Sequence, residues 1–216
     1  SEMCIRDSLI YKDSNLKNIT ADENFNTFSL SWYNNTDVDP ATGLTPYINM
    51  QKVLKVCHDF VDNFDNTFSN LLFIGQTGVG KTFLSNCIAR ALMDSCHSII
   101  YLTAGEFFDS FKSDDFKEFG SSKFDTSFFV ECDLLIIDDL GTEKASDYNF
   151  SNLFNTINER LLRRKSIIIS SNLEMPDIET RYSQRIFSRL VSAYSILRLF
   201  GDDIRCMKKL SPTKRS

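Results

Sequence analysis

The sequence predicts an α/β protein built on a five-stranded parallel sheet flanked by helices. Short apolar runs recur along the chain, and segments with helical spacing of apolar residues separate them. The runs are apolar at consecutive positions, as expected of strands that are buried on both faces. The five runs are Leu71–Ile74, Ile99–Leu102, Leu134–Ile137, Ile167–Ile169 and Tyr194–Phe200.

Length and composition predict a globular protein. The chain has 216 residues, 42% of them hydrophobic and 25% charged, which suits one domain with an appendage. A net charge of -5, from 24 basic and 29 acidic residues, argues against coating nucleic acid through bulk charge. The six cysteines include no C-x-x-C pair, so they do not match a zinc site or a disulfide framework. No apolar run is long enough to span a bilayer, and we expect a soluble, cytoplasmic protein without membrane contact.

The first 45 residues differ from the rest of the chain. They are rich in Asn, Asp, Ser and Thr and have little sustained periodicity. The first eight letters, SEMCIRDS, resemble translated sequencing-adapter sequence, so we expect an artefactual or truncated N-terminus and leave them out of the fold prediction. The later part of this region either lies against the main domain as an extended arm or forms a mobile tail. Its apolar residues are Phe25, Phe28, Leu30, Trp32 and Tyr33.

Amphipathic helices are predicted between the strands. One begins near Tyr47, a second includes residues 84–92, and a third includes residues 150–161, each with apolar residues three or four positions apart. Thr103 followed by Glu106 has the spacing of a capping box, which predicts another helix start. The alternation of strand and helix predicts βαβ units.

The strongest functional signal is the segment GQTGVGKT at residues 75–82, which matches G-x-x-x-x-G-K-[ST] between a strand and a helix. Its glycines let successive backbone N–H groups face an anion at the positive end of the helix. Lys81 would reach the β- and γ-phosphates, and Thr82 would hold Mg²⁺. The sequence therefore predicts ATP and Mg²⁺ as ligands. The expected nucleotide contacts are Gly75, Gln76, Thr77, Gly78, Val79, Gly80, Lys81, Thr82 and Phe83.

Two other predicted strands end in polar residues suited to phosphate chemistry. Asp138 follows the run 134–137 and is placed to hold the Mg²⁺ shell, while Asp139 is a candidate to orient or deprotonate the attacking water. An Asp at the second position reaches less far than the Glu of many such ATPases, which predicts slow turnover. Asn172 would hydrogen-bond the γ-phosphate and the water, or it is a turn residue ahead of Pro176.

Arginines near the C-terminal end are candidates for stabilising transition-state charge. Arg181, Arg185 and Arg189 precede the last predicted strand, and the latter two share one helix face. An arginine supplied to a neighbour's nucleotide can act in trans, although surface ion pairing explains each of the three equally well. Arg205 follows the last strand and could fold back on the phosphates.

These motifs, in their order and spacing, resemble the AAA+ ATPases of the DnaC type. This family contains the bacterial and phage helicase loaders, and the IstB transposition helper is a near relative. The likeness covers residues 45–209 in the segments GQTGVGKTFLSNCIARAL, LLIIDDLG, IIISSN and RIFSRL. It implies Walker A at Lys81 and Thr82, Walker B at Asp138 and Asp139, sensor 1 at Asn172, an arginine finger at Arg189, and a candidate sensor 2 at Arg205.

The resemblance also implies an organisation and partners. We expect an N-terminal arm over residues 1–45, an AAA+ ATPase domain over 46–205 with its helical lid absent or vestigial, and a basic tail over 206–216. The expected partners are a replicative DNA helicase, whose binding region is expected to be missing from this chain, single-stranded DNA, and further copies of the chain. Residues 107–129, with Lys112, Lys117 and Lys123, resemble the place where related proteins carry a DNA-contacting helix.

Several other functions remain as alternatives or are disfavoured. A GTPase would need an Asn-Lys-x-Asp segment, which the sequence lacks. A small-molecule kinase would need a lid with phosphate-clamping arginines. An IstB-like transposition helper and an ATP-dependent scaffold with little turnover stay open beside the helicase loader, whose turnover would be stimulated by self-association or DNA. We expect the adenine pocket near the 47–50 segment.

Overall fold

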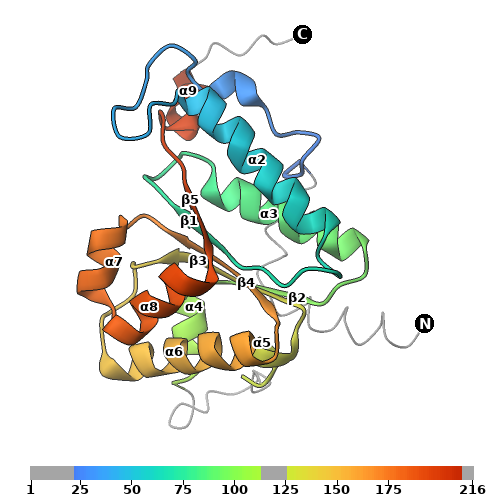
Figure 1. Cartoon of the computed structure of the whole chain (residues 1–216), viewed down its shortest axis with the longest axis vertical. Coiled ribbons are helices and arrows are strands. Elements are labelled where there is room, and N and C mark those ends of the chain that lie inside the picture. Colours follow the sequence, from blue (N-terminus) through green and yellow to red (C-terminus); the bar gives the residue numbers. More distant parts are fainter. Residues whose placement is uncertain (1–21, 113–125, 211–216) are drawn as a thin grey trace.

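The computed structural model describes residues 22–112 and 126–210. Figure 1 shows a central sheet with helices on both faces. The elements are η2 (Leu30–Trp32), α2 (Pro46–Asp62), β1 (Leu71–Ile74), α3 (Lys81–Asp94), β2 (Ile99–Thr103), α4 (Ala104–Asp109), α5 (Phe128–Glu131), β3 (Leu134–Leu140), α6 (Asp147–Leu162), β4 (Ser166–Ser171), α7 (Met175–Arg181), α8 (Gln184–Ala193), β5 (Ser195–Arg198) and α9 (Ile204–Leu210).

All five predicted strands form one parallel sheet in the order β2-β3-β4-β1-β5. The order places β4 between β1 and β3, so the loops that follow these three strands meet at one edge of the sheet. Ligand sites of open α/β sheets lie at this carboxyl edge. The predicted α/β fold is therefore confirmed.

Alternating side chains divide the core between the two faces of the sheet. Leu71 and Phe73 of β1 pack with α2 and α3, while Leu72 and Ile74 pack with the layer that contains α4, α6 and α8. Figure 1 shows these helices on opposite sides of the strands. Since every β1 side chain is buried, burial on both faces is confirmed for this strand.

Local sequence signals start the helices where they were predicted. The Thr45 hydroxyl accepts a hydrogen bond from the Ile48 backbone N–H at 3.3 Å, and Pro46 occupies the first turn of α2. Thr103 and Glu106 form the predicted capping box of α4. These caps satisfy N–H groups that have no acceptor within the helix.

Two strand predictions need correction. The fifth strand is shorter than its apolar run and is partly exposed, because it lies at an edge of the sheet and pairs only with β1 in the described part of the chain. The third strand does not stop before Asp139 but continues to Leu140, with an irregular register between Ile137 and Leu140. This irregularity gives Asp139 a backbone conformation that the sequence pattern does not reveal.

The described part of the N-terminal region packs against the domain. Phe25 lies against His58 of α2 with ring centroids 4.2 Å apart, and Phe28 lies against Phe83 of α3 at 5.6 Å. Figure 1 shows this segment beside α2 and near α9, which crosses the boundary expected between the domain and the basic tail. Among the described helices, none is long and apolar enough to cross a membrane.

Candidate nucleotide-binding site

The GQTGVGKT segment forms the loop between β1 and α3. Gly80 is the N-cap of α3, has φ +104° and provides no side-chain cap, so the first N–H groups of the helix have no partner from a capping side chain. A Cβ atom at Gly80 would lie 2.6 Å from the Tyr33 hydroxyl oxygen, and only glycine fits there. An uncapped helix start of this kind suits a phosphate group.

Lys81 extends its ammonium group along this loop, and only 4% of the residue is exposed. Its Nζ donates to the carbonyl oxygens of Gly75 and Gln76 at 2.6 and 2.8 Å, and to Asn172 Oδ1 at 2.6 Å. Burial lowers the pKa of Lys81, while the carboxylates of Asp139 and Asp138 act in the opposite direction. Since all three acceptors are neutral, phosphate oxygens could replace them with a gain in charge pairing.

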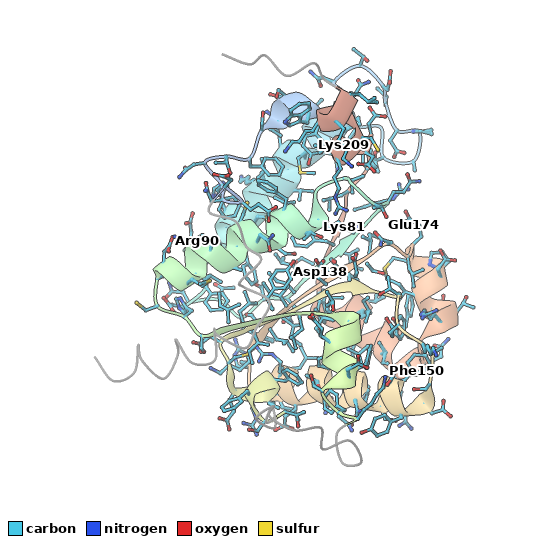
Figure 2. The ribbon with its side chains drawn as sticks, turned by 180° about the vertical axis from the view of Figure 1, so that it is seen from behind. Lys81, Arg90, Asp138, Phe150, Glu174 and Lys209 are labelled. Atoms are coloured by element: carbon cyan, nitrogen blue, oxygen red, sulfur yellow. The ribbon has the colours of Figure 1, made fainter. Side chains whose placement is uncertain are left out.

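Asp138 accepts hydrogen bonds from hydroxyl groups on three elements. Its Oδ2 accepts from Thr82 Oγ1 of α3 at 3.0 Å and from the Tyr101 hydroxyl of β2 at 2.9 Å, and its Oδ1 accepts from Ser170 Oγ of β4. Burial, and then the Asp138 carboxylate, raise the pKa of Tyr101. Figure 2 shows Lys81 and Asp138 in the central region of the molecule, where α3 meets the sheet.

The donor set around Thr82 and Asp138 fits Mg²⁺. One hydroxyl and one carboxylate lie together beside a phosphate-binding loop, and no cluster of three metal-ligating side chains occurs in the described residues. Mg²⁺ is commonly bound by one or two carboxylates with substrate phosphates and water completing its shell. These two residues are therefore suited to hold a Mg²⁺ ion that arrives with a nucleotide.

Asp139 and Asn172 extend the polar chain toward the position of an attacking water. Asp139 has φ +57°, and its N–H donates to Ser170 Oγ at 2.9 Å. Asn172 Nδ2 donates to Asp139 Oδ1 at 3.3 Å. Burial, and then the Asp138 carboxylate, raise the pKa of Asp139, while Lys81 and the Asn172 hydrogen bond act against this rise. Left-handed backbone at a non-glycine residue is typical of functional sites.

A cavity of about 300 Å³ opens beside these groups. Its walls come from the phosphate-binding loop, from Asp139 and Asn172, from residues 23–33 and from α9. Aromatic rings form one part of the wall, and Lys208 Nζ lies 5.7 Å from the centroid of the Trp32 ring and 5.9 Å from that of Phe83. The cavity thus combines a cationic and carboxylate end with an aromatic end. Residues 47–50, where the adenine pocket was expected, do not line it.

Two segments far apart in sequence hold the phosphate-binding loop. The Tyr33 hydroxyl donates to the Val79 carbonyl oxygen at 3.1 Å, and the Ile204 N–H donates to the Gly78 carbonyl oxygen at 3.1 Å. Arg205, one residue later in α9, lines the cavity. The structure therefore brings Arg205 to the phosphate-binding loop, where the sequence placed it as a candidate.

The three candidate arginines of α7 and α8 lie away from this cavity. Arg189 Nη2 donates to Asn158 Oδ1 at 3.1 Å, and Arg181 is bound by the side chain and carbonyl of Glu143. Arg185 is exposed, and within the described residues none of the three arginines lines the cavity. Arg189 and Arg185 could therefore serve a nucleotide only in another copy of the chain.

The sequence prediction did not identify Tyr101, Ser170 or Lys208 as site residues, and it left Trp32 and Tyr33 open as arm or tail. Tyr101 is a polar residue within the apolar run 99–102, and Ser170 directly follows the run 167–169 inside the buried strand, which is the signal that could have identified them. Of the residues proposed for DNA contact, Lys112 pairs with Asp109 at 2.7 Å. Lys117 and Lys123 lie outside the described residues.

Comparison with known proteins gives one family match and several distant relatives. The IstB-like ATP binding protein family matches residues 47–211. The replicative helicase loader DnaC of Escherichia coli K12 is 23% identical over 151 residues, covering 69% of this chain and 61% of DnaC. The phage-like element PBSX protein XkdC of Bacillus subtilis is 32% identical over 111 residues, covering 49% of this chain and 40% of XkdC. The matched regions thus span less than two thirds of each relative.

Solved structures share the fold at low sequence identity. A DnaC helicase loader structure superposes with a TM-score of 0.63 at 21% identity, covering 80% of this chain and 96% of that one. AMPPCP-bound DnaA from Aquifex aeolicus gives a TM-score of 0.65 at 18% identity, covering 92% of this chain and 59% of that one. With most of its length matched from Tyr47 to Ser211 and a P-loop site in place, the chain belongs to the IstB-like ATP binding protein family of P-loop ATPases.

Proposed function

We propose that this chain binds and hydrolyses ATP with Mg²⁺ as the motor of a replicative helicase loader that contacts single-stranded DNA in a nucleotide-dependent manner. The observation that carries the ATPase part is the hydrogen-bonded chain from Lys81 through Asn172 to Asp139, which borders the cavity at the phosphate-binding loop. These hydrogen bonds hold a cation for the phosphates and a carboxylate for the attacking water close together.

Hydrolysis would use these residues in distinct roles. Lys81 would leave its carbonyl acceptors to bind the β- and γ-phosphates, while Thr82 and Asp138 would hold Mg²⁺, which neutralises charge on the phosphate oxygens. Asn172 would orient the attacking water, and Asp139 would accept its proton as the bond to the γ-phosphorus forms and ADP leaves. Arg205 lines the cavity and would add positive charge near the phosphates.

The aromatic end of the cavity is the proposed site of the adenine base. The Phe28 and Phe83 rings are 5.6 Å apart, and Trp32 lies near the Lys208 ammonium group. Flat rings and a cation suit a purine, which stacks on aromatic faces. Since this chain has one tryptophan, quenching of Trp32 fluorescence by ATP tests the placement directly. Trp32→Phe provides the signal-free control for this titration.

Arg189 is proposed to act on the nucleotide of a neighbouring copy, with Arg185 as the second candidate on the same helix. Arg189 is exposed on α8 and does not line its own cavity. Turnover should therefore depend on protein concentration, and Arg189→Ala should be inactive although it binds ATP. Mixing Arg189→Ala with Lys81→Ala should restore part of the activity, because an intact loop then meets an intact arginine. Equal specific activity from dilute to concentrated protein would contradict this role.

The DNA and helicase partners are proposed from the relatives. DnaC is named as a replicative helicase loader, and a DnaA with the same fold is described as bound to AMPPCP and single-stranded DNA. The likeness to that DnaA, with a TM-score of 0.59 and 19% identity, supports a shared fold. The family match to IstB-like proteins favours one second candidate, an IstB-like transposition helper.

Fluorescence anisotropy with labelled single- and double-stranded DNA distinguishes these functions. The protein is titrated into each labelled DNA in the presence of ATP, in the presence of ADP and without nucleotide. Lys81→Ala serves as the variant that does not respond to ATP. An ATP-dependent preference for single strands that disappears in Lys81→Ala is the expected result. A preference for duplex DNA would instead favour the transposition helper. ATP binding without measurable turnover would identify an ATP-dependent scaffold.

A further inference from the structure

The Asp138 carboxylate is held from one side by a residue of the neighbouring edge strand. We propose that Tyr101 is a positioning residue for the metal site, whose hydroxyl keeps Asp138 in the orientation that accepts a hydrogen bond from the Thr82 hydroxyl. This inference rests on the proposed ATP- and Mg²⁺-dependent function and adds a residue that no motif of the sequence contains. It rests on a 2.9 Å hydrogen bond between two buried side chains on adjacent strands.

The sheet register explains how Tyr101 reaches Asp138. Tyr101 of β2 lies opposite Ile136 of β3, and Thr103 lies opposite Asp138. Residues two apart on a strand share a face, so Tyr101 and Asp138 both face the α3 side of the sheet as diagonal neighbours. The long tyrosine side chain spans the two-residue offset, and its ring is packed in the core on that side with only 6% of the residue exposed.

The arrangement of donors fixes the carboxylate plane. Tyr101 and Thr82 both donate to Oδ2, whereas Ser170 donates to Oδ1 from the other side. Rotation about the Cβ–Cγ bond would disturb all three hydrogen bonds together. Because the Thr82 hydroxyl points its hydrogen at Asp138, the lone pairs of Oγ1 are left for a metal ion at the phosphates. Without Tyr101, the carboxylate can turn and leave Thr82 without a fixed acceptor.

Another tyrosine provides a matched control. Tyr194 is also buried, at 7% exposed against 6% for Tyr101, but its hydroxyl has no hydrogen-bond partner within the described residues. It packs on the opposite face of the sheet from Tyr101. The substitutions Tyr101→Phe and Tyr194→Phe therefore remove the same atom from two buried sites, and only one of these atoms contacts Asp138.

The test separates metal binding from nucleotide binding. The affinity for a fluorescent ATP analogue is measured by anisotropy in EDTA and then across a MgCl₂ titration, for the full chain and both variants. We expect Tyr101→Phe to bind the metal-free analogue within about twofold of the parent, because Lys81 and the loop are unchanged. We expect the Mg²⁺ concentration at half-saturation to rise about tenfold, as is typical when a group behind a metal ligand is lost. Tyr194→Phe should match the parent in both measurements.

The remaining outcomes count against the proposal. An unchanged Mg²⁺ dependence in Tyr101→Phe would overturn it. A tenfold loss of metal-free affinity would also overturn it, since Tyr101 would then support the loop rather than the metal site. Absence of ATP binding by the parent chain would overturn the proposed function and this inference with it. Thermal unfolding without nucleotide, expected to show one cooperative transition for each variant, verifies that both are folded.

Discussion

Each end of the parallel sheet contains a buried cation whose hydrogen-bond acceptors are uncharged. Lys81 lies at the carboxyl end and donates to two loop carbonyls and an asparagine side chain. Arg160 of α6 lies at the amino end, is fully buried, and donates to four backbone carbonyls, at Phe129, Cys132, Asp133 and Ser166. Within the described residues neither cation forms an ion pair with a carboxylate.

The difference between the two sites lies in what their partners can do. Lys81 itself and its acceptor Asn172 line an open cavity, so phosphate oxygens can reach the ammonium group. The carbonyl acceptors of Arg160 belong to α5, to the loop before β3 and to the first residue of β4. Arg160 therefore links these three segments in the core. Buried carbonyls without a donor are costly, and no ligand can replace Arg160. The amino end is therefore suited to stabilise the fold, and the carboxyl end is open to a ligand.

The largest expected effect is that of Arg160→Met on stability. The substitution leaves four buried carbonyls without their donor and should lower the free energy of unfolding by about 3 kcal/mol. Urea denaturation without nucleotide measures it. The control is Arg163→Met, which removes an exposed ion pair with Glu159 and should cost less than about 0.5 kcal/mol. Similar losses in the two variants would contradict a stabilising role for Arg160.

Next comes Lys81→Ala, which should affect binding rather than stability. Loss of the ammonium–phosphate hydrogen bonds should weaken ATP binding by about 10- to 100-fold. The unfolding free energy without nucleotide should change by less than about 1 kcal/mol, because Asn172 lines the cavity and Gln76 is exposed, so two of the three partners left behind can reach water. Titration of Trp32 fluorescence measures the affinity, and Lys165→Ala at the amino end is the control expected to bind like the parent. A large loss of stability in Lys81→Ala would remove the distinction between the two ends.

A smaller effect is expected for Tyr33→Phe, which removes one hydrogen bond to the phosphate-binding loop. Burial raises the pKa of Tyr33, so its hydroxyl remains a donor to the Val79 carbonyl oxygen. We expect ATP affinity to fall about fivefold, equivalent to about 1 kcal/mol for one neutral hydrogen bond. Anisotropy of a fluorescent ATP analogue measures the change, with Tyr194→Phe as control. An unchanged affinity would mean that the loop holds its shape without this segment.

The smallest effect concerns Asp133 at the amino end, where Lys165 Nζ and Ser98 Oγ donate to the carboxylate at 2.7 and 2.8 Å. Burial alone would raise the pKa of Asp133, but these hydrogen bonds outweigh it and lower the pKa. A lowered folded-state pKa stabilises the protein above the unfolded value of about 3.9, and this contribution disappears as the pH falls through the folded value. Asp133→Asn should therefore cost below about 1 kcal/mol near neutral pH.

Urea denaturation of Asp133→Asn and its parent at several pH values tests this sign. The difference in unfolding free energy should be constant from neutral pH down to about 4 and should shrink below it. A difference that grows in acid would mean that the Asp133 carboxylate does not stabilise the fold through its ionised form.

The sequence by itself determined the parallel fold and the core residues of the candidate nucleotide-binding site. Lys81, Thr82, Asp138 and Asn172 each follow or join a short contiguous pattern, and the carboxyl ends of parallel strands meet at one edge. The strand order, with β4 between β1 and β3, brings these residues together in the folded chain. Short patterns at strand ends are readable because their structure depends on neighbours in the chain.

Only the tertiary structure decided how this core is supported. The contact between Tyr101 and Asp138, the bond from Tyr33 to Val79, and the buried Arg160 all join residues from separate elements. The same holds for the edge position of β5, which its apolar run does not show. Such contacts depend on which strands are neighbours and on the register between them, and a single sequence carries neither as a local pattern.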